Sequence, residues 1–200
     1  MKVISVSGYK GGVSKTVTAV HLATFFSELG KTLLIDGDPN GSAISWAEKG
    51  NLPFKVVDQK GSMKAIGEGN DFIICDSPAR PDSRDVKELK NGSDLLILPT
   101  IPDPLSLLPM LQIAAVLAGS NYRALIAINP PKPNLDGESM QAELREAGIP
   151  VFDTKIRRSI GIPKAVLAGT AVRDLPGRDR MAWLDYQSLG NEVLEMLTDD

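Results

Sequence analysis

The sequence predicts an α/β protein whose mostly parallel sheet is doubly wound, with helices on both faces. Three observations lead to this prediction. Short apolar runs alternate with stretches of helical spacing along the 200 residues. A glycine-rich turn joins the first apolar run to the first helical stretch, and two later apolar runs end in aspartate. No internal repeat or domain boundary interrupts the pattern, so we expect one domain over residues 1–200.

The first quarter of the chain sets the alternation. The run KVISVS (2–7) is uninterrupted and β-branched, as expected of a strand buried on both faces. The stretch 15–29 has apolar residues near helical spacing and stops before Gly30, a favourable residue after a helix end. KTLLID (31–36) follows as the second strand, and 42–50 is a short helix that ends at Gly50.

The same criteria place the remaining elements. Further strands are predicted at 54–58, 71–76, 94–100, 122–129 and 149–153. Further helices are predicted around 82–91 and at 105–119, 137–148, 159–169 and 182–198. The helix at 105–119 contains Pro109, which a helix tolerates only in its first turn or at a kink.

Composition excludes several classes of site. The formal net charge is −3, and 42% of the residues are hydrophobic, which is ordinary for a globular protein. One cysteine, Cys75, and one histidine, His21, can form neither an intrachain disulfide nor a cysteine or histidine metal site. We expect both to be ordinary packed residues. No apolar run is long enough to cross a membrane and no signal peptide is evident, so we expect a cytoplasmic protein.

The turn GYKGGVSKT (8–16) nearly fits the phosphate-binding pattern G-x-x-x-x-G-K-[ST]. Ser14 stands where that pattern has glycine. Backbone N–H groups at the start of a helix cradle phosphate, Lys15 would neutralise its charge, and the Thr16 hydroxyl would ligate Mg²⁺. The alternative is a strand-to-helix turn whose glycines only permit close packing.

Carboxylates follow two later apolar runs. LLIDGDP ends in Asp36 and Asp38, and FIICDSP ends in Asp76. Ligands of parallel sheets bind at the carboxyl ends of the strands, where these side chains would lie beside the glycine-rich turn. Such aspartates can hold the water shell of a metal ion, although any one of them could simply cap a helix or turn.

Taken together, these motifs resemble the ParA/MinD family of ATPases. KGGVSKT matches the family's deviant phosphate loop, K-G-G-x-x-K-[ST], in which the residue before the second lysine is free. IDGDPNGSA resembles its D-x-D-P-Q motif with Asn40 in place of glutamine, and DFIICDSPA resembles its later aspartate motif. The resemblance covers essentially the whole chain. Within the family, the chain is similar to the small plasmid-partition ParA proteins and to the carboxysome-distributing McdA proteins.

The resemblance implies a P-loop NTPase of the deviant Walker-A type that hydrolyses ATP slowly with Mg²⁺. Lys10 would reach the phosphates bound in a partner subunit, so a homodimer would form when ATP is bound. Lys10, Lys15 and Asp38 would be catalytic, with Asp38 orienting the attacking water. Mg²⁺ would be held by Thr16, Asp36 and Asp76. ATP contacts would come from Lys10, Gly11, Gly12, Val13, Ser14, Lys15, Thr16, Val17 and Asn129.

A local excess of positive charge lies between residues 155 and 180. Its basic residues are Lys155, Arg157, Arg158, Lys164, Arg173, Arg178 and Arg180, against two acidic residues. The resemblance implies that this basic region binds DNA without sequence preference and associates with the nucleoid when ATP is bound. A ParB-like or McdB-like adaptor would stimulate hydrolysis, and the cargo would be a plasmid or a carboxysome. The alternatives are a solvated basic face and, for Lys155, a second contact to nucleotide across the dimer.

Several other functions are compatible with a phosphate-binding loop of this kind. The membrane-bound MinD branch ends in a basic amphipathic helix, whereas residues 184–200 contain no lysine or arginine and five acidic residues, so we expect no membrane binding. One cysteine excludes the shared iron–sulfur cluster of the nitrogenase iron protein. A small-molecule synthetase or kinase of the dethiobiotin synthetase type remains an alternative, as does a nucleotide-dependent binding switch with negligible hydrolysis.

Overall fold

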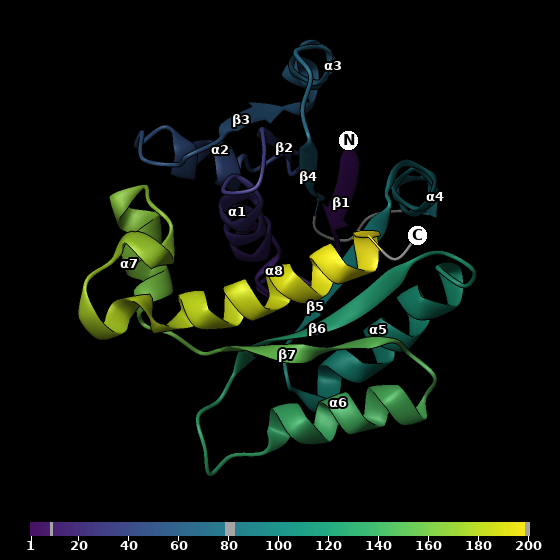
Figure 1. The fold of residues 1–200 in the computed structure, drawn as a ribbon. Helices are drawn as coiled ribbons and strands as arrows, with labels where there is room; N and C mark the ends of the chain where they lie inside the picture. Colours follow the sequence, from purple (N-terminus) through teal and green to yellow (C-terminus); the bar gives the residue numbers. More distant parts are fainter. Residues whose placement is uncertain (9, 79–82, 199–200) are drawn as a thin grey trace.

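A computed structural model describes residues 1–8, 10–78 and 83–198. The described residues form one seven-stranded sheet in the order β3-β2-β4-β1-β5-β6-β7, in which every neighbouring pair is parallel (Figure 1). The strands are β1 (Lys2–Val6), β2 (Thr32–Asp36), β3 (Lys55–Asp58), β4 (Phe72–Asp76), β5 (Leu95–Thr100), β6 (Tyr122–Asn129) and β7 (Val151–Arg157). The predicted fold class is confirmed.

Helices cover both faces of this sheet. They are α1 (Lys15–Phe26), α2 (Ser42–Ala47), α3 (Gln59–Gly67), α4 (Ser83–Gly92), α5 (Pro104–Val116), α6 (Asp136–Glu146), α7 (Gly161–Ala168) and α8 (Ala182–Thr198). Two 3-10 turns, η1 (Val172–Asp174) and η2 (Gly177–Met181), join α7 to α8. No helix among the described residues is long and apolar enough to cross a membrane.

The core is divided by the sheet. On one face α1, α2, α7 and α8 share a cluster that includes Phe26, Trp46 and Tyr186. On the other face α4, α5 and α6 share a second cluster, and α3 covers a third, smaller one. Burial on both faces explains why the central strands β1 and β5 read as uninterrupted apolar runs.

Parallel register brings the predicted site residues to one edge of the sheet. Asp76 is the register partner of Val6, the last residue of β1, and also of Asp36, the last residue of β2. The glycine-rich turn leaves β1 at this same edge and enters α1. The sheet therefore brings the phosphate loop and the aspartates that end β2 and β4 to the same edge.

Two elements differ from the predictions. Helix α3 was not predicted, because its sequence contains two internal or terminal glycines and only Ala65 of its side chains is buried. The Asp58 side chain nevertheless starts this helix by accepting the N–H of Gly61. Strand β7 continues to Arg157 rather than ending at 153, since Ile156 points into the core while its neighbours Lys155 and Arg157 face outward.

Candidate functional site

The end of the phosphate loop, the glycine-rich turn of residues 8–16, enters α1 through a left-handed residue. This residue, Ser14, has a φ of 72° and directly precedes α1. The standard motif has glycine there, and the positive φ explains why, since a β-carbon disfavours this conformation. Lys15, the first residue of α1, is only 8% exposed. Ser14 therefore holds a backbone conformation that is strained for a residue with a β-carbon.

Thr16 and Asp76 form the polar centre of the site. The Thr16 hydroxyl donates to Asp76 Oδ2 at 2.6 Å. Asp76 is 1% exposed, and its other oxygen, Oδ1, has no hydrogen-bond partner among the described residues. Burial raises the pKa of Asp76 to about 7; the bond from Thr16 and the charge of Lys15 oppose this, and the charge of Asp36 adds to it. A buried carboxyl oxygen without a partner is suited to a cation or its bound water.

The first aspartate loop is held by its own backbone. Asp36 Oδ2 accepts the N–H groups of Ala43 and Ile44 at 2.9 and 3.0 Å, which caps α2. Asp38 Oδ1 accepts two bonds from Asn40. Capping by Asp36 was one of the alternatives left open by the sequence, and its contact with Mg²⁺ stays a prediction.

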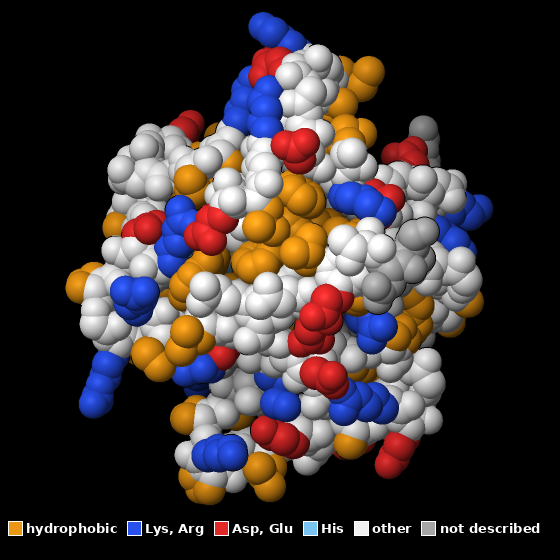
Figure 2. Space-filling view, viewed as in Figure 1, with side chains coloured by type: hydrophobic (Ala, Val, Ile, Leu, Met, Phe, Trp, Pro, Cys, Tyr) orange, Lys and Arg blue, Asp and Glu red, His pale blue; other side chains and the backbone are white. Residues whose placement is uncertain are grey.

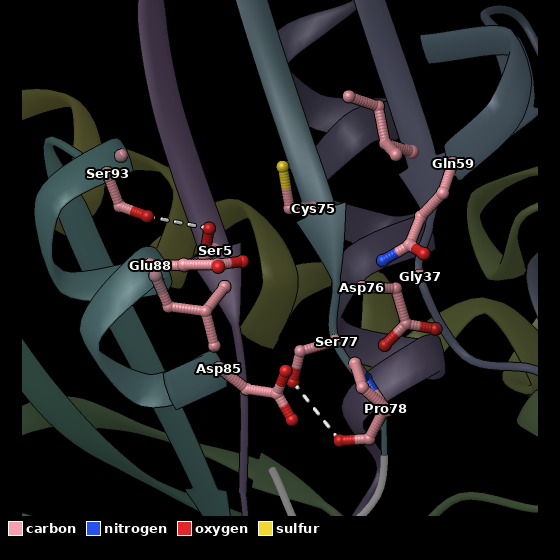
Figure 3. Close-up of a pocket in the computed structure, with 13 residues that line it drawn as sticks. Ser5, Gly37, Gln59, Cys75, Asp76, Ser77, Pro78, Asp85, Glu88 and Ser93 are labelled. Atoms are coloured by element: carbon pink, nitrogen blue, oxygen red, sulfur yellow. Dashed lines mark hydrogen bonds between the residues drawn. The ribbon is translucent and has the colours of Figure 1, made fainter. Parts of the chain in front are cut away.

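The first aspartate loop, residues 36–41, touches the end of β4. Gly37 N donates to the carbonyl of Asp76 at 2.8 Å, and a β-carbon on Gly37 would lie 2.9 Å from that oxygen. Only glycine permits this approach without displacement. Figure 3 shows Gly37 and Asp76 together at one wall of a cavity of about 250 Å³, with the Gln59 amide directed toward them. Because this cavity is lined by neither Lys15 nor Thr16, it lies beside the phosphate site rather than within it.

Lys10 is paired within its own chain. Its Nζ lies 2.7 Å from Asp103 Oδ2 and 3.3 Å from the Ser106 hydroxyl. Asp103 also caps α5 by accepting the N–H of Leu105, and the bond from Lys10 lowers the pKa of its carboxyl. Neither partner was predicted. The sequence Asp103-Pro104 does signal a helix start, but it does not show which lysine lies nearby.

Two cavities lie at the ends of β6 and β7, and one of them also borders the phosphate loop. One, of about 230 Å³, is lined by Ser14 and Val17 together with Ile128, Ile156, Ile162 and Pro163. The other, of about 480 Å³, is lined by Asn129 and Lys155. Arg157 and Arg158 border both. The apolar cavity has the chemistry of a slot for a flat base, and it adjoins the loop expected to hold phosphate.

Asn129 borders the polar cavity, and its Oδ1 has no hydrogen-bond partner among the described residues. A β-carbon on Gly137 would lie 1.9 Å from that oxygen, so the side chain is packed directly against α6. Lys155 Nζ contacts Gln141 Oε1 at 3.2 Å and Glu138 at 3.8 Å. The predicted contact of Asn129 with adenine and the alternative role of Lys155 at the nucleotide remain predictions.

The basic region divides into paired and unpaired side chains. Arg157 donates three bonds to Asp185, two from its guanidinium and one from its backbone, and this pairing raises the pKa of Arg157. Lys164 pairs with Asp179, and Arg173 with Glu28 and Asp174. Arg158, Arg178 and Arg180 are exposed and form no ion pair with another described residue. These three side chains are the ones available to an anionic partner.

Known proteins resemble this chain along its length. The family described as the CobQ/CobB/MinD/ParA nucleotide binding domain matches residues 4–172. The maintenance of carboxysome distribution protein A of Gloeobacter kilaueensis is 33% identical over 96% of this chain and 94% of its own length.

Two solved structures share the fold. The McdA–ATP complex of Cyanothece superposes with a TM-score of 0.77 at 16% identity, covering 98% of this chain and 96% of that one. MinD of Pyrococcus horikoshii with Mg-ADP superposes with a TM-score of 0.72 at 20% identity, covering 99% and 98%. The two structures show the shared fold, and the match over residues 4–172 together with the full-length relative establishes that the chain belongs to the ParA/MinD family of nucleotide-binding ATPases.

Proposed function

We propose that this protein is a cytoplasmic, Mg²⁺-dependent ATPase that positions a cargo by cycling on DNA. ATP binding joins two copies into a dimer with the nucleotides between them, and this dimer binds nonspecific DNA and associates with the nucleoid. A ParB-like or McdB-like adaptor stimulates hydrolysis and releases the dimer. The full-length likeness to a carboxysome distribution protein favours a carboxysome as cargo over a plasmid.

The contact between Thr16 and Asp76 is the observation that best supports a nucleotide site here. The hydroxyl and the unpartnered Asp76 Oδ1 fit a hydrated Mg²⁺ ion, Lys15 neutralises phosphate charge, and the loop amides bind phosphate oxygens. When bound, Mg·ATP supplies the phosphoanhydride bond that is hydrolysed. Asp38 orients the attacking water, and Asp36 supports its loop through the α2 cap.

Lys10 makes the site depend on a second copy of the chain. It lies in the phosphate loop but points to α5 rather than to Lys15. Redirected across a two-fold axis, its ammonium group would stabilise charge on the partner's nucleotide in the way that an arginine finger does. Dimerisation and hydrolysis would then be linked through one side chain.

DNA binding is assigned to the basic region, chiefly to the unpaired Arg158, Arg178 and Arg180. A dimer doubles the number of phosphate contacts, and nonspecific affinity rises with each contact through counterion release. In Figure 2, lysine and arginine side chains project from the edge of the molecule where α7, η2 and the start of α8 meet. Nucleotide-controlled dimerisation therefore gives nucleotide-controlled DNA binding.

The deciding experiment measures retention on nonspecific DNA with no nucleotide, with Mg·ADP and with Mg·ATP. We expect retention only with Mg·ATP, accompanied by a dimer in sedimentation. Equal retention in all three states, or none in any, would reject the positioning cycle. Adding a ParB-like or McdB-like adaptor should accelerate both phosphate release and loss from DNA.

A small-molecule synthetase of the dethiobiotin synthetase type is the second candidate, because the matched family also includes the CobQ and CobB proteins. That function requires a pocket for a metabolite, and the cavity beside Asp76 and Gln59 offers one. It predicts ATP turnover that depends on a metabolite and not on DNA or an adaptor. The same retention experiment, run with turnover measurements, separates the two candidates.

A further inference from the structure

A chain of contacts leads away from the first aspartate loop, residues 36–41. It begins at Asp36, whose Oδ2 accepts the N–H groups of Ala43 and Ile44 in the first turn of α2. Helix α2 is only six residues long, so a displacement at its first turn moves the whole helix. The loop and α2 thus form one mechanical unit.

The far end of α2 and the residues just after it are bonded to the end of α7. Trp46 Nε1 donates to the carbonyl of Thr170 at 3.0 Å, and Lys49 Nζ donates to the carbonyl of Val166 at 2.5 Å. Asn51 Nδ2 adds a third bond, to the carbonyl of Ala168 at 3.2 Å. All three acceptors lie in the last turn of α7 or just beyond it, where a helix leaves carbonyl groups for outside donors.

The contact between the end of α7 and the segment after α2 is closely packed. Gly169, the residue that ends α7, has a φ of 66°, and a β-carbon there would lie 2.1 Å from Lys49 Cβ. Trp46 is 2% exposed, and its ring meets the ring of His21 of α1 edge-on, with the ring centroids 5.7 Å apart. Glycine is required here both for the left-handed conformation and for the close approach of the two segments.

Helix α7 is in turn packed on the turns that carry the unpaired arginines. A β-carbon on Gly161 would lie 1.9 Å from the carbonyl oxygen of Asp179, and Lys164 pairs with the Asp179 carboxylate at 2.6 Å. Asp179 stands between Arg178 and Arg180 in η2. Helix α7, η1 and η2 therefore form one unit, residues 161–181, that presents basic side chains to solvent.

We propose that α2 couples the nucleotide site to the unit 161–181, with Trp46 and Lys49 as the positioning residues. Mg²⁺ that arrives with the nucleotide beside Asp36 and Asp38 competes for carboxylates that now accept hydrogen bonds from backbone N–H groups. Changing those bonds shifts α2, and its bonds to residues 166–170 transmit the shift to the arginines of η2. The identity of the ligand rests on the proposed function, whereas the coupling itself is a property of these contacts.

The test is hydrogen exchange with and without Mg·ATP, read at the amides of residues 161–174, because this readout needs no DNA. We compare the wild type with a Trp46→Phe, Lys49→Met variant, which keeps the packed ring and the aliphatic stem but removes both donors. Lys90→Met is the matched control, since Lys90 Nζ donates to the carbonyl of Ala118 in the same manner at a helix end remote from α7.

In the wild type and in Lys90→Met, Mg·ATP should change the exchange rates of residues 161–174 by at least about fivefold, the lower end of typical coupling between sites. The double variant should bind Mg·ATP with the wild-type affinity and lose this response. If it fails to fold, Lys49→Met alone serves the same comparison. A wild type whose residues 161–174 exchange equally with and without bound ATP, or a variant that keeps the response, overturns the coupling. Absence of ATP binding to the wild type, measured directly by calorimetry, would reject the proposed function as well.

Discussion

Lys10 Nζ lies 2.7 Å from Asp103 Oδ2, so the lysine expected to reach a second subunit is held by a carboxylate of its own chain. The Ser106 hydroxyl is a second partner at 3.3 Å. Both partners belong to the N-terminal end of α5, where Asp103 also caps the helix. In the proposed dimer, this intramolecular ion pair would have to open before Lys10 could act, and Asp103 would compete with the partner's phosphate for Lys10.

Asp103→Asn should promote ATP-dependent dimerisation. Asparagine keeps the cap on α5 but removes the charge that retains Lys10. Because the pair is partly exposed, we expect a modest effect, a dimer dissociation constant lowered roughly two- to fivefold. Sedimentation velocity with Mg·ATP over a range of protein concentrations measures it.

Asp136→Asn is the matched control for that variant. Asp136 and Asp103 line the same groove between α5 and α6, but Asp136 bonds to Asn134 and not to Lys10. It should dimerise as the wild type does. Equal dimerisation of all three proteins would show that the pair with Asp103 places no restraint on Lys10.

Ser14→Gly should stabilise the protein relative to Ser14→Ala. Both changes remove the hydroxyl, but only glycine adopts the observed φ of 72° without strain from a β-carbon. The left-handed conformation costs about 1 kcal/mol for a residue with a side chain. Thermal unfolding should therefore place Ser14→Gly about 2–4 °C above Ser14→Ala, as expected for a chain of this size. The reverse order would mean that the loop relaxes to another conformation when the side chain changes.

The sequence was sufficient to predict the sheet, the loop and the edge at which the aspartates meet. Buried parallel strands have long apolar runs, and parallel register forces Asp36 and Asp76 to the same edge once both end their strands. Helix α3 was not predicted because Ala65 is its only buried side chain, so its sequence has little helical hydrophobic periodicity. Its capping by Asp58 was the available signal.

The side-chain partners of the site could not be predicted from the sequence. Lys10 and Asp103 are 93 residues apart and meet only through the crossover from β5 to α5. The same holds for Arg157 and Asp185, which pair across β7 and α8. In the sequence, Arg157 and Arg178 contribute equally to the positive charge of the basic region. In the fold, Asp185 neutralises the charge of Arg157, whereas Arg178 is exposed. The local sequence pattern predicts helices and strands, whereas ion pairs between residues far apart in the sequence depend on the tertiary fold.

Asp76→Asn should stabilise the fold at pH 8 and weaken Mg·ATP binding. Burial raises the pKa of Asp76 from 3.8 to about 7, so the native state keeps a proton that the unfolded chain releases. Stability is therefore lost as the pH rises from about 4 to 7, by up to about 4 kcal/mol. Asparagine accepts the Thr16 hydroxyl without a charge. Urea unfolding at pH 4 and pH 8 should show a gain only at pH 8, and an equal effect at both would contradict the buried charge.

His21 should produce the opposite dependence on pH. Complete burial lowers its pKa from 6.5 to about 4, and its Nε2 accepts the N–H of Val172, so the native state excludes a proton that the unfolded chain binds. This contribution is present above pH 6.5 and is lost as the pH falls toward 4, by up to about 3 kcal/mol.

Because Asp76 titrates in the opposite sense over the same range, the effect of His21 is best measured in Asp76→Asn. That variant should lose stability between pH 6.5 and 4, and adding His21→Gln should remove most of the loss. Parallel stability curves for the single and double variants would show that His21 does not titrate as its burial predicts.

Arg178→Gln with Arg180→Gln should weaken DNA binding, whereas Arg157→Gln should chiefly weaken the fold. Each phosphate contact contributes about 0.9 to the dependence of log affinity on log salt. Two arginines in each half of a dimer should therefore lower that slope by up to about 4. Arg157 is bound to Asp185, so its replacement should lower the unfolding temperature and leave the salt slope nearly unchanged. Filter binding with Mg·ATP from 50 to 200 mM salt, the range over which phosphate contacts are most evident, distinguishes these outcomes. A slope that falls for Arg157→Gln and stays constant for the double variant would place the DNA contacts on β7 instead of η2.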